Sequence, residues 1–234
     1  LEVMGRHAGW IAAAAGLAGN GPAEPPHIIL FPEVPFDQAA FLRRVKRSVT
    51  DHEYCVVVVS EGTRYRDGRF LADAGTTDAF GHQQLGGVAQ VVVQLVKDEL
   101  GFKFHYAIAD YLQRSARHIA SATDAKQAYA VGRSAVELAL AGHNSIMTTI
   151  VRKSDRPYRW TIGQTPLSRV ANREKTLPKR YIRADGFGIT AAARRYLAPL
   201  IRGEDYPPYT DGLPDYVTLK NVPVAQKLRT KFVL

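Results

Sequence analysis

The chain is poor in cysteine and has no long hydrophobic run. Cys55 is the only cysteine among 234 residues, so an intrachain disulfide is excluded and a reducing, cytoplasmic setting is expected. We interpret its thiol, at the start of an apolar run, as buried and inert. No apolar segment approaches the roughly 20 residues that span a bilayer, and the alanine-rich stretch at 11–18 is too short. These absences predict a protein without a membrane-spanning segment.

The sequence also lacks the usual motifs of zinc and nucleotide binding. Its seven histidines are dispersed, none at zinc-ligand spacing, and no glycine-rich loop ends in Lys-Ser or Lys-Thr. Basic residues concentrate late in the chain: residues 1–150 hold 14 Lys/Arg and 15 Asp/Glu, residues 151–234 hold 17 and 7. They are scattered among Pro, Tyr and Gly, which favours a solvated surface or one that attracts small anions. We therefore expect no nucleic-acid partner.

Alternating strand-like and helix-like segments predict an α/β fold. Strands are expected at 27–31, 54–60, 102–108 and 145–151, and helices at 10–18, 38–50, 84–100 and 124–141, with Asp37 capping the second helix. The run at 54–60 is continuously apolar, as in parallel strands buried on both faces. The polar stretch at 63–83 is expected to be a mobile surface loop.

Two domains follow from this pattern. Residues 1–151 are predicted to form Rossmann-like layers, a parallel sheet covered by helices. From residue 152 the sequence pattern changes: residues 158–162 alternate like an edge strand, and prolines separate short expected helices. Residues 152–234 are predicted to be a mixed α+β extension that packs back on the core. The chain starts inside its first strand, and we expect the N-terminal part of the full fold to be missing.

Three polar segments follow expected strands, at the edge where ligands of open α/β sheets bind. Met4-Gly5-Arg6 combines an open backbone with a fixed positive charge and suits an anion. Glu61 can accept hydrogen bonds from hydroxyls, and the segment Tyr111 to Arg114 can hold a phosphate. Taken singly, each has an ordinary alternative: a turn, a capping carboxylate, or a structural Tyr–Arg loop.

Together the three segments resemble the phosphofructokinase family, in the family's order. There Met-Gly-Arg contacts fructose 6-phosphate, a Glu-Gly carboxylate binds its hydroxyls, and Tyr-Leu-Gln-Arg of the pyrophosphate-dependent members holds its phosphate. The ATP-dependent branch typically has His where Tyr111 stands, which favours pyrophosphate as donor. The stretches at 185–190, 203–209 and 212–217 also resemble the C-terminal extension of bacterial pyrophosphate-dependent enzymes. The resemblance implies substrate binding by Met4, Gly5, Arg6, Glu61, Tyr111, Leu112, Gln113 and Arg114.

The resemblance further implies the C-terminal part of a glycolytic enzyme that transfers a phosphoryl group from pyrophosphate to the 1-hydroxyl of fructose 6-phosphate. Arg6 would share charge in the transition state. Mg²⁺ is implied as cofactor and a homo-oligomer as the assembly. The metal ligands, catalytic base and donor loop would lie in the missing part, so the fragment itself is expected to be inactive. Two alternatives stay open: an ATP-dependent kinase of the same fold, and a non-catalytic sugar-phosphate-binding subunit.

Overall fold

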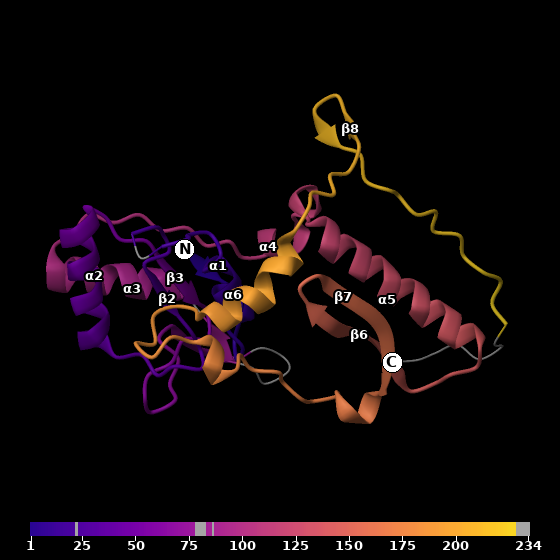
Figure 1. Ribbon diagram of the computed structural model, residues 1–234, viewed down its shortest axis with the longest axis horizontal. Helices are drawn as coiled ribbons and strands as arrows, with labels where there is room; N and C mark the ends of the chain where they lie inside the picture. Colours follow the sequence, from indigo (N-terminus) through magenta and orange to yellow (C-terminus); the bar gives the residue numbers. More distant parts are fainter. Residues whose placement is uncertain (22, 78–82, 86, 228–234) are drawn as a thin grey trace.

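A three-stranded parallel sheet lies at the centre of the larger part of the molecule (Figure 1). The computed structural model of the protein describes residues 1–21, 23–77, 83–85 and 87–227. The sheet has the order β1-β3-β2, and β3 pairs in parallel with both neighbours. Its strands are β1 (Glu2–Val3), β2 (Ile28–Leu30) and β3 (Val57–Ser60). The predicted α/β fold with a parallel sheet is confirmed.

The remaining strands form antiparallel pairs outside this sheet. They are β4 (Asp73–Thr77) with β5 (Gln83–Leu85), β6 (Ile146–Asp155) with β7 (Tyr158–Pro166), and β8 (Tyr209–Thr210) with β9 (Leu213–Pro214). The α-helices are α1 (Trp10–Ala15), α2 (Gln38–His52), α3 (Val88–Leu100), α4 (Leu112–Ser115), α5 (Ala122–Leu140) and α6 (Ala191–Leu197). Short 3₁₀ turns are η1 (Arg117–Ile119), η2 (Leu167–Arg169), η3 (Lys179–Tyr181) and η4 (Ala198–Ile201).

Helices cover both faces of the parallel sheet. Side chains alternate along a strand, so Ile28 and Leu30 pack with α2 and α3, whereas Ile29 packs with α1 and α6 on the other face. Helix α6 belongs to the predicted C-terminal extension and contributes Ala193 and Leu197 to this second cluster. The extension thus supplies core that residues 1–151 leave open. The division at 151 itself stays a prediction, since β6 runs across that residue.

Side-chain caps fix where several helices begin. The Asp37 carboxylate accepts a hydrogen bond from the Ala40 N–H at 2.9 Å, which confirms the predicted cap of α2. Ser121 caps α5 through the Asp124 N–H, and Thr190 caps α6 through the Ala193 N–H. Helix α3 begins at Val88 rather than at 84, because Gly87 takes a left-handed conformation just before it.

Several other predicted elements differ from the structure. The strand expected at 102–108 is reduced to one parallel bridge between Glu2 and Ile108, because its neighbour β1 is only two residues long. The strand expected at 145–151 is β6, which pairs with β7 across a tight turn at 156–157 instead of joining the parallel sheet. The loop expected at 63–83 contains β4 and reaches β5, and its residues 78–82 lie outside the described residues.

Cys55 is half-buried rather than buried. Burial raises the pKa of its thiol, which keeps the group protonated at neutral pH and agrees with the predicted inertness. Among the described residues, no helix combines the length and apolar character needed to cross a bilayer.

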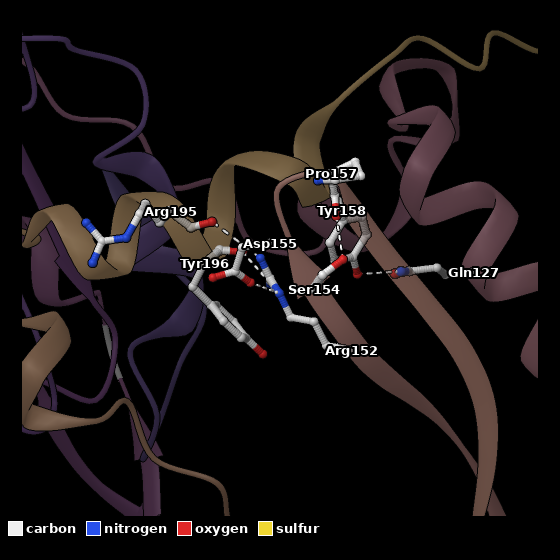
Figure 2. Close-up of polar contacts among 8 residues, drawn as sticks. All are labelled: Gln127, Arg152, Ser154, Asp155, Pro157, Tyr158, Arg195 and Tyr196. Atoms are coloured by element: carbon white, nitrogen blue, oxygen red, sulfur yellow. Dashed lines mark hydrogen bonds and ion pairs between the residues drawn. The ribbon is translucent and has the colours of Figure 1, made fainter.

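Helix α5 and the β6–β7 hairpin extend away from the parallel sheet (Figure 1). Arg152 of β6 joins this part to α6, as Figure 2 shows. Its guanidinium donates to the carbonyl of Tyr196 at 2.7 Å and of Arg195 at 3.3 Å, at the end of the helix where cations are favoured. The same group lies 4.8 Å from the ring centroid of Tyr158 and 4.5 Å from that of Tyr196. Arg152 therefore fixes how the hairpin meets the core.

Replacing Arg152 by alanine is expected to lower the free energy of unfolding by roughly 2 kcal/mol, in the range for hydrogen bonds to a charged group. Arg152→Lys should lose part of this stability, because an ammonium cannot reproduce the planar fork. Urea denaturation followed by circular dichroism measures both. Arg159→Ala, an exposed residue of β7, is the control. Equal stability of the Arg152→Ala and Arg159→Ala proteins would show that the contacts of Arg152 with α6 do not stabilise the fold.

Candidate functional site

Strand pairing brings the first two predicted segments together. β1 and β3 are parallel neighbours, with Val3 opposite Ser60, so the turns that follow them leave the same edge of the sheet. The Glu61 carboxylate accepts a hydrogen bond from the Gly5 N–H at 3.1 Å. The Ser60 hydroxyl donates to the Gly5 carbonyl at 2.6 Å. Met4-Gly5-Arg6 and Glu61-Gly62 therefore form one continuous surface.

Two glycines make this close approach of the turns feasible. Gly5 has a φ of 140°, and a Cβ there would lie 2.6 Å from the Ser60 hydroxyl. A Cβ on Gly62 would lie 1.8 Å from the Arg6 carbonyl oxygen, inside the backbone itself. Any side chain at residue 62 would push the two turns apart.

The third segment arrives on the opposite side of β1. The Glu2 N–H donates to the Ala107 carbonyl at 2.9 Å, and the Ala109 N–H donates to the Glu2 carbonyl at 3.3 Å. Asp110, which follows, begins the turn into α4. The Gln113 side chain then accepts a hydrogen bond from the Met4 N–H at 3.2 Å and donates to the Asp110 carbonyl at 3.0 Å. Gln113 thus ties the Tyr111–Arg114 segment to the Met4–Arg6 turn.

The three segments line one cavity of about 680 Å³. Its lining residues are Met4, Gly5, Arg6, His7, Ala8, Glu61, Asp110, Tyr111, Arg114, Glu174 and Lys175. Six of the eight predicted binding residues are therefore brought together. The other two, Leu112 and Gln113, do not line the cavity, and Leu112 is 71 % exposed to solvent. The binding roles of all eight stay predictions.

The cavity lining combines three cationic side chains, Arg6, Arg114 and Lys175, with three carboxylates, Glu61, Asp110 and Glu174. Within the described part of the chain, the Arg6, Arg114 and Lys175 side chains form no ion pair. Arg114 instead lies over the Tyr111 ring, 5.3 Å from its centroid, which leaves the guanidinium edge for a ligand. Unpaired arginines on a concave surface suit a phosphate, which accepts bidentate hydrogen bonds.

The buried Glu2 carboxyl interacts electrostatically with two carboxylates that line the cavity, Glu61 and Asp110. Glu2 accepts a hydrogen bond from the Ala89 N–H at 2.9 Å, at the start of α3. Burial raises the pKa of the Glu2 carboxyl above its ordinary value of 4.5, and the carboxylates of Glu61 and Asp110 raise it further, against the opposing Ala89 hydrogen bond. The folded state therefore binds this proton more tightly than the unfolded state does.

The raised pKa of Glu2 makes stability pH-dependent. Stability from this group is fully present below pH 4.5 and is lost as pH rises through the folded pKa. Glu2→Gln keeps an acceptor for Ala89 but removes the charge, so we expect higher stability at pH 7 and a smaller fall between pH 4.5 and 7. Thermal melts across this range test it, with Glu99→Gln, an exposed carboxyl of α3, as control. Unchanged pH dependence in Glu2→Gln would contradict the assignment.

Five lining residues were not among the predicted site residues. Asp110 and His7–Ala8 are sequence neighbours of predicted residues, and their position at strand ends could have indicated them. Glu174 and Lys175 come from the C-terminal extension, more than 160 positions from His7 and Trp10, which they contact. No local pattern in the sequence marks them.

The described residues do not fit a magnesium site. Among them, no group of three or more His, Cys, Asp or Glu side chains is placed to hold a metal ion. Two carboxylates of the cavity already have partners: Glu61 accepts a hydrogen bond from the Gly5 N–H, and Glu174 is paired with His7.

Comparison with known proteins places the chain in one family. The family model described as "Phosphofructokinase" matches residues 1–139. The chain is 61% identical over 228 residues to a pyrophosphate--fructose 6-phosphate 1-phosphotransferase of Halomonas elongata, covering 97% of this chain and 54% of that protein. It is 62% identical over 232 residues to the protein of the same name from Methylococcus capsulatus, covering 99% and 55%. The chain thus spans about half the length of these curated relatives.

A solved structure agrees over the whole chain. The crystal structure of a pyrophosphate-dependent phosphofructokinase from Marinobacter aquaeolei superposes with a TM-score of 0.87 at 56% sequence identity. The match covers 100% of this chain and 55% of that one.

Proposed function

The chain belongs to the phosphofructokinase family, and on that premise we propose that it is part of an enzyme that transfers a phosphoryl group from pyrophosphate to the 1-hydroxyl of fructose 6-phosphate. Within that enzyme, this chain binds the sugar phosphate. The observation that carries this proposal is the single cavity shared by Arg6, Glu61, Tyr111 and Arg114. The relatives' names, which specify pyrophosphate and fructose 6-phosphate, support the choice of substrates.

Arg114 and Tyr111 hold the 6-phosphate in this proposal. The guanidinium fork donates two charge-assisted hydrogen bonds to phosphate oxygens, and the phenol donates a neutral third. Their stacked arrangement orders both side chains before the ligand arrives, since the guanidinium already lies 5.3 Å from the ring centroid. Less side-chain freedom is then lost on binding.

Glu61 and the Met4–Arg6 turn orient the sugar. The second carboxylate oxygen of Glu61 accepts hydrogen bonds from sugar hydroxyls, while its first oxygen is held by the Gly5 N–H. Arg6 lies beside the acceptor end and stabilises negative charge that develops during transfer. Fixing the acceptor in line with the donor is itself a large contribution, on the order of 7–11 kcal/mol of a barrier for well-oriented reactants.

Three further properties belong to the same proposal. Pyrophosphate is the donor, the whole enzyme is a cytoplasmic homo-oligomer, and Mg²⁺ supplies charge neutralisation of the phosphates when bound. The donor loop, the base for the 1-hydroxyl and the metal ligands are assigned to sequence outside this chain, so no step here passes through the metal.

Calorimetric titration of the 234-residue chain tests the proposed site. Fructose 6-phosphate should bind, and fructose, which lacks the phosphate, should bind at least about tenfold more weakly, because the charge-assisted contacts are lost. The chain alone should show no turnover with pyrophosphate. Indistinguishable binding of the two sugars, or turnover equal to that of an intact enzyme, would contradict the proposal. An intact enzyme that uses ATP in preference to pyrophosphate would overturn the donor assignment alone.

A further inference from the structure

The C-terminal extension contributes a wall to the cavity through Glu174 and Lys175. Several contacts hold the chain in place at residues 174–177. The Trp10 indole N–H donates to the Lys175 carbonyl at 2.7 Å, and His7 pairs with Glu174. One oxygen of Glu33 accepts both the Gly9 N–H, at 2.9 Å, and the Leu177 N–H, at 2.7 Å.

These contacts place Lys175 on one side of the cavity. His7 and Trp10 contact residues 174 and 175 directly, and Gly9 is linked to Leu177 through Glu33. All three positions closely follow Arg6 in the sequence. The Lys175 ammonium lies 5.7 Å from the Trp10 ring centroid, and the ring orders the side chain without neutralising it. Lys175 is therefore a second unpaired cation on the Arg6 side.

The positions of the cations around the cavity indicate how many phosphate groups its ligand carries. A sugar monophosphate bound through Arg114 and Tyr111 needs no cation pair at its other end. A sugar with phosphates at both ends needs positive charge at each end, because every buried phosphate oxygen that leaves water must regain hydrogen bonds. Arg6 together with Lys175 meets that requirement at the Met4–Arg6 turn.

We propose that Lys175 binds the second phosphate of the sugar, the 1-phosphate of fructose 1,6-bisphosphate. The residue would act with Arg6, and the C-terminal extension would thereby complete the substrate site. This inference rests on the proposed function, since it takes the 6-phosphate to lie at Arg114.

Calorimetric titration of the 234-residue chain with fructose 1,6-bisphosphate and, separately, fructose 6-phosphate tests the inference. Lys175→Met removes the charge and keeps most of the stem. We expect it to weaken binding of the bisphosphate about tenfold, the loss of one charge-assisted contact, and to change binding of the monophosphate less than about threefold. Lys175→Arg should keep the preference for the bisphosphate. Lys179→Met, an exposed lysine of the same extension outside the cavity lining, should behave as the unmodified chain.

The outcomes separate this inference from the function on which it rests. If the unmodified chain binds both sugars and Lys175→Met binds both equally well, Lys175 is no phosphate ligand. If Lys175→Met weakens both sugars to the same extent, the residue does not select the second phosphate. If the unmodified chain binds neither sugar, the proposed function fails, and the inference with it. Circular dichroism spectra and melting temperatures of each variant confirm that the exposed substitution leaves the fold intact.

Discussion

Replacing Arg114 by alanine should weaken binding of fructose 6-phosphate at least tenfold. The guanidinium has no ion pair within the described residues, lines the cavity and stacks on Tyr111, so its hydrogen-bonding capacity is left for the ligand. A hydrogen bond to a charged group contributes about 1.5–3 kcal/mol, and about 1.4 kcal/mol corresponds to a tenfold change in affinity. A bidentate contact should therefore exceed tenfold.

The Arg114→Lys variant separates the contribution of bidentate hydrogen bonding by the guanidinium from that of its positive charge. The ammonium keeps the positive charge but cannot bind a phosphate bidentately, so its affinity should fall between those of the unmodified chain and Arg114→Ala. Arg43→Ala, an exposed arginine of α2 away from the cavity, is the control for a general loss of positive charge. Calorimetric affinities of Arg114→Ala and Arg43→Ala that agree would remove Arg114 from the site.

Introducing a methyl group at Gly62 should destabilise the fold by roughly 3 kcal/mol, at the upper end for overpacked sites. The Cβ of Gly62→Ala would lie 1.8 Å from the Arg6 carbonyl oxygen and 2.6 Å from the Arg6 Cα. Neither atom can move without shifting the Met4–Arg6 turn. Binding of the sugar phosphate should therefore be lost together with stability, even though Gly62 offers no side chain to a ligand.

Gly132→Ala is the matched control for this backbone effect. Gly132 lies within α5, and a Cβ there meets nothing within 4 Å. Alanine in a helix interior is more stable than glycine by about 0.5–1 kcal/mol, so this variant should gain stability. Chemical denaturation measures both variants. A Gly62→Ala protein as stable as the unmodified chain, with unchanged sugar affinity, would show that the turns do not need this close approach.

Much of the parallel layer and the candidate site could be predicted from the sequence. The apolar run ending at Ser60 and the short strand ending at Val3 indicated buried parallel strands, and parallel strands end at one edge. Arg6, Glu61 and Arg114, each following such a strand, were therefore expected to meet. The structure places all three in one cavity. Asp37 was predictable as a cap because its hydrogen bond is local.

Long-range contacts set the limit of that prediction. Residues 102–108 have the composition of a strand, but a two-residue partner allows a single bridge. Pairing within the β6–β7 hairpin is antiparallel, a feature set by the turn at 156–157 rather than by the apolar pattern of β6. Lys175 lines the cavity in a segment held by long-range contacts, in which Trp10 hydrogen-bonds to the Lys175 carbonyl and Glu33 to the Leu177 N–H. No periodicity encodes such a contact.

A crystal structure of the chain with bound fructose 6-phosphate tests the central claim most directly. We expect the 6-phosphate within hydrogen-bonding distance of Arg114 and Tyr111, sugar hydroxyls on Glu61, and the 1-hydroxyl on the Arg6 side. A sugar bound in another cavity, or one in this cavity with its phosphate away from Arg114, would contradict it.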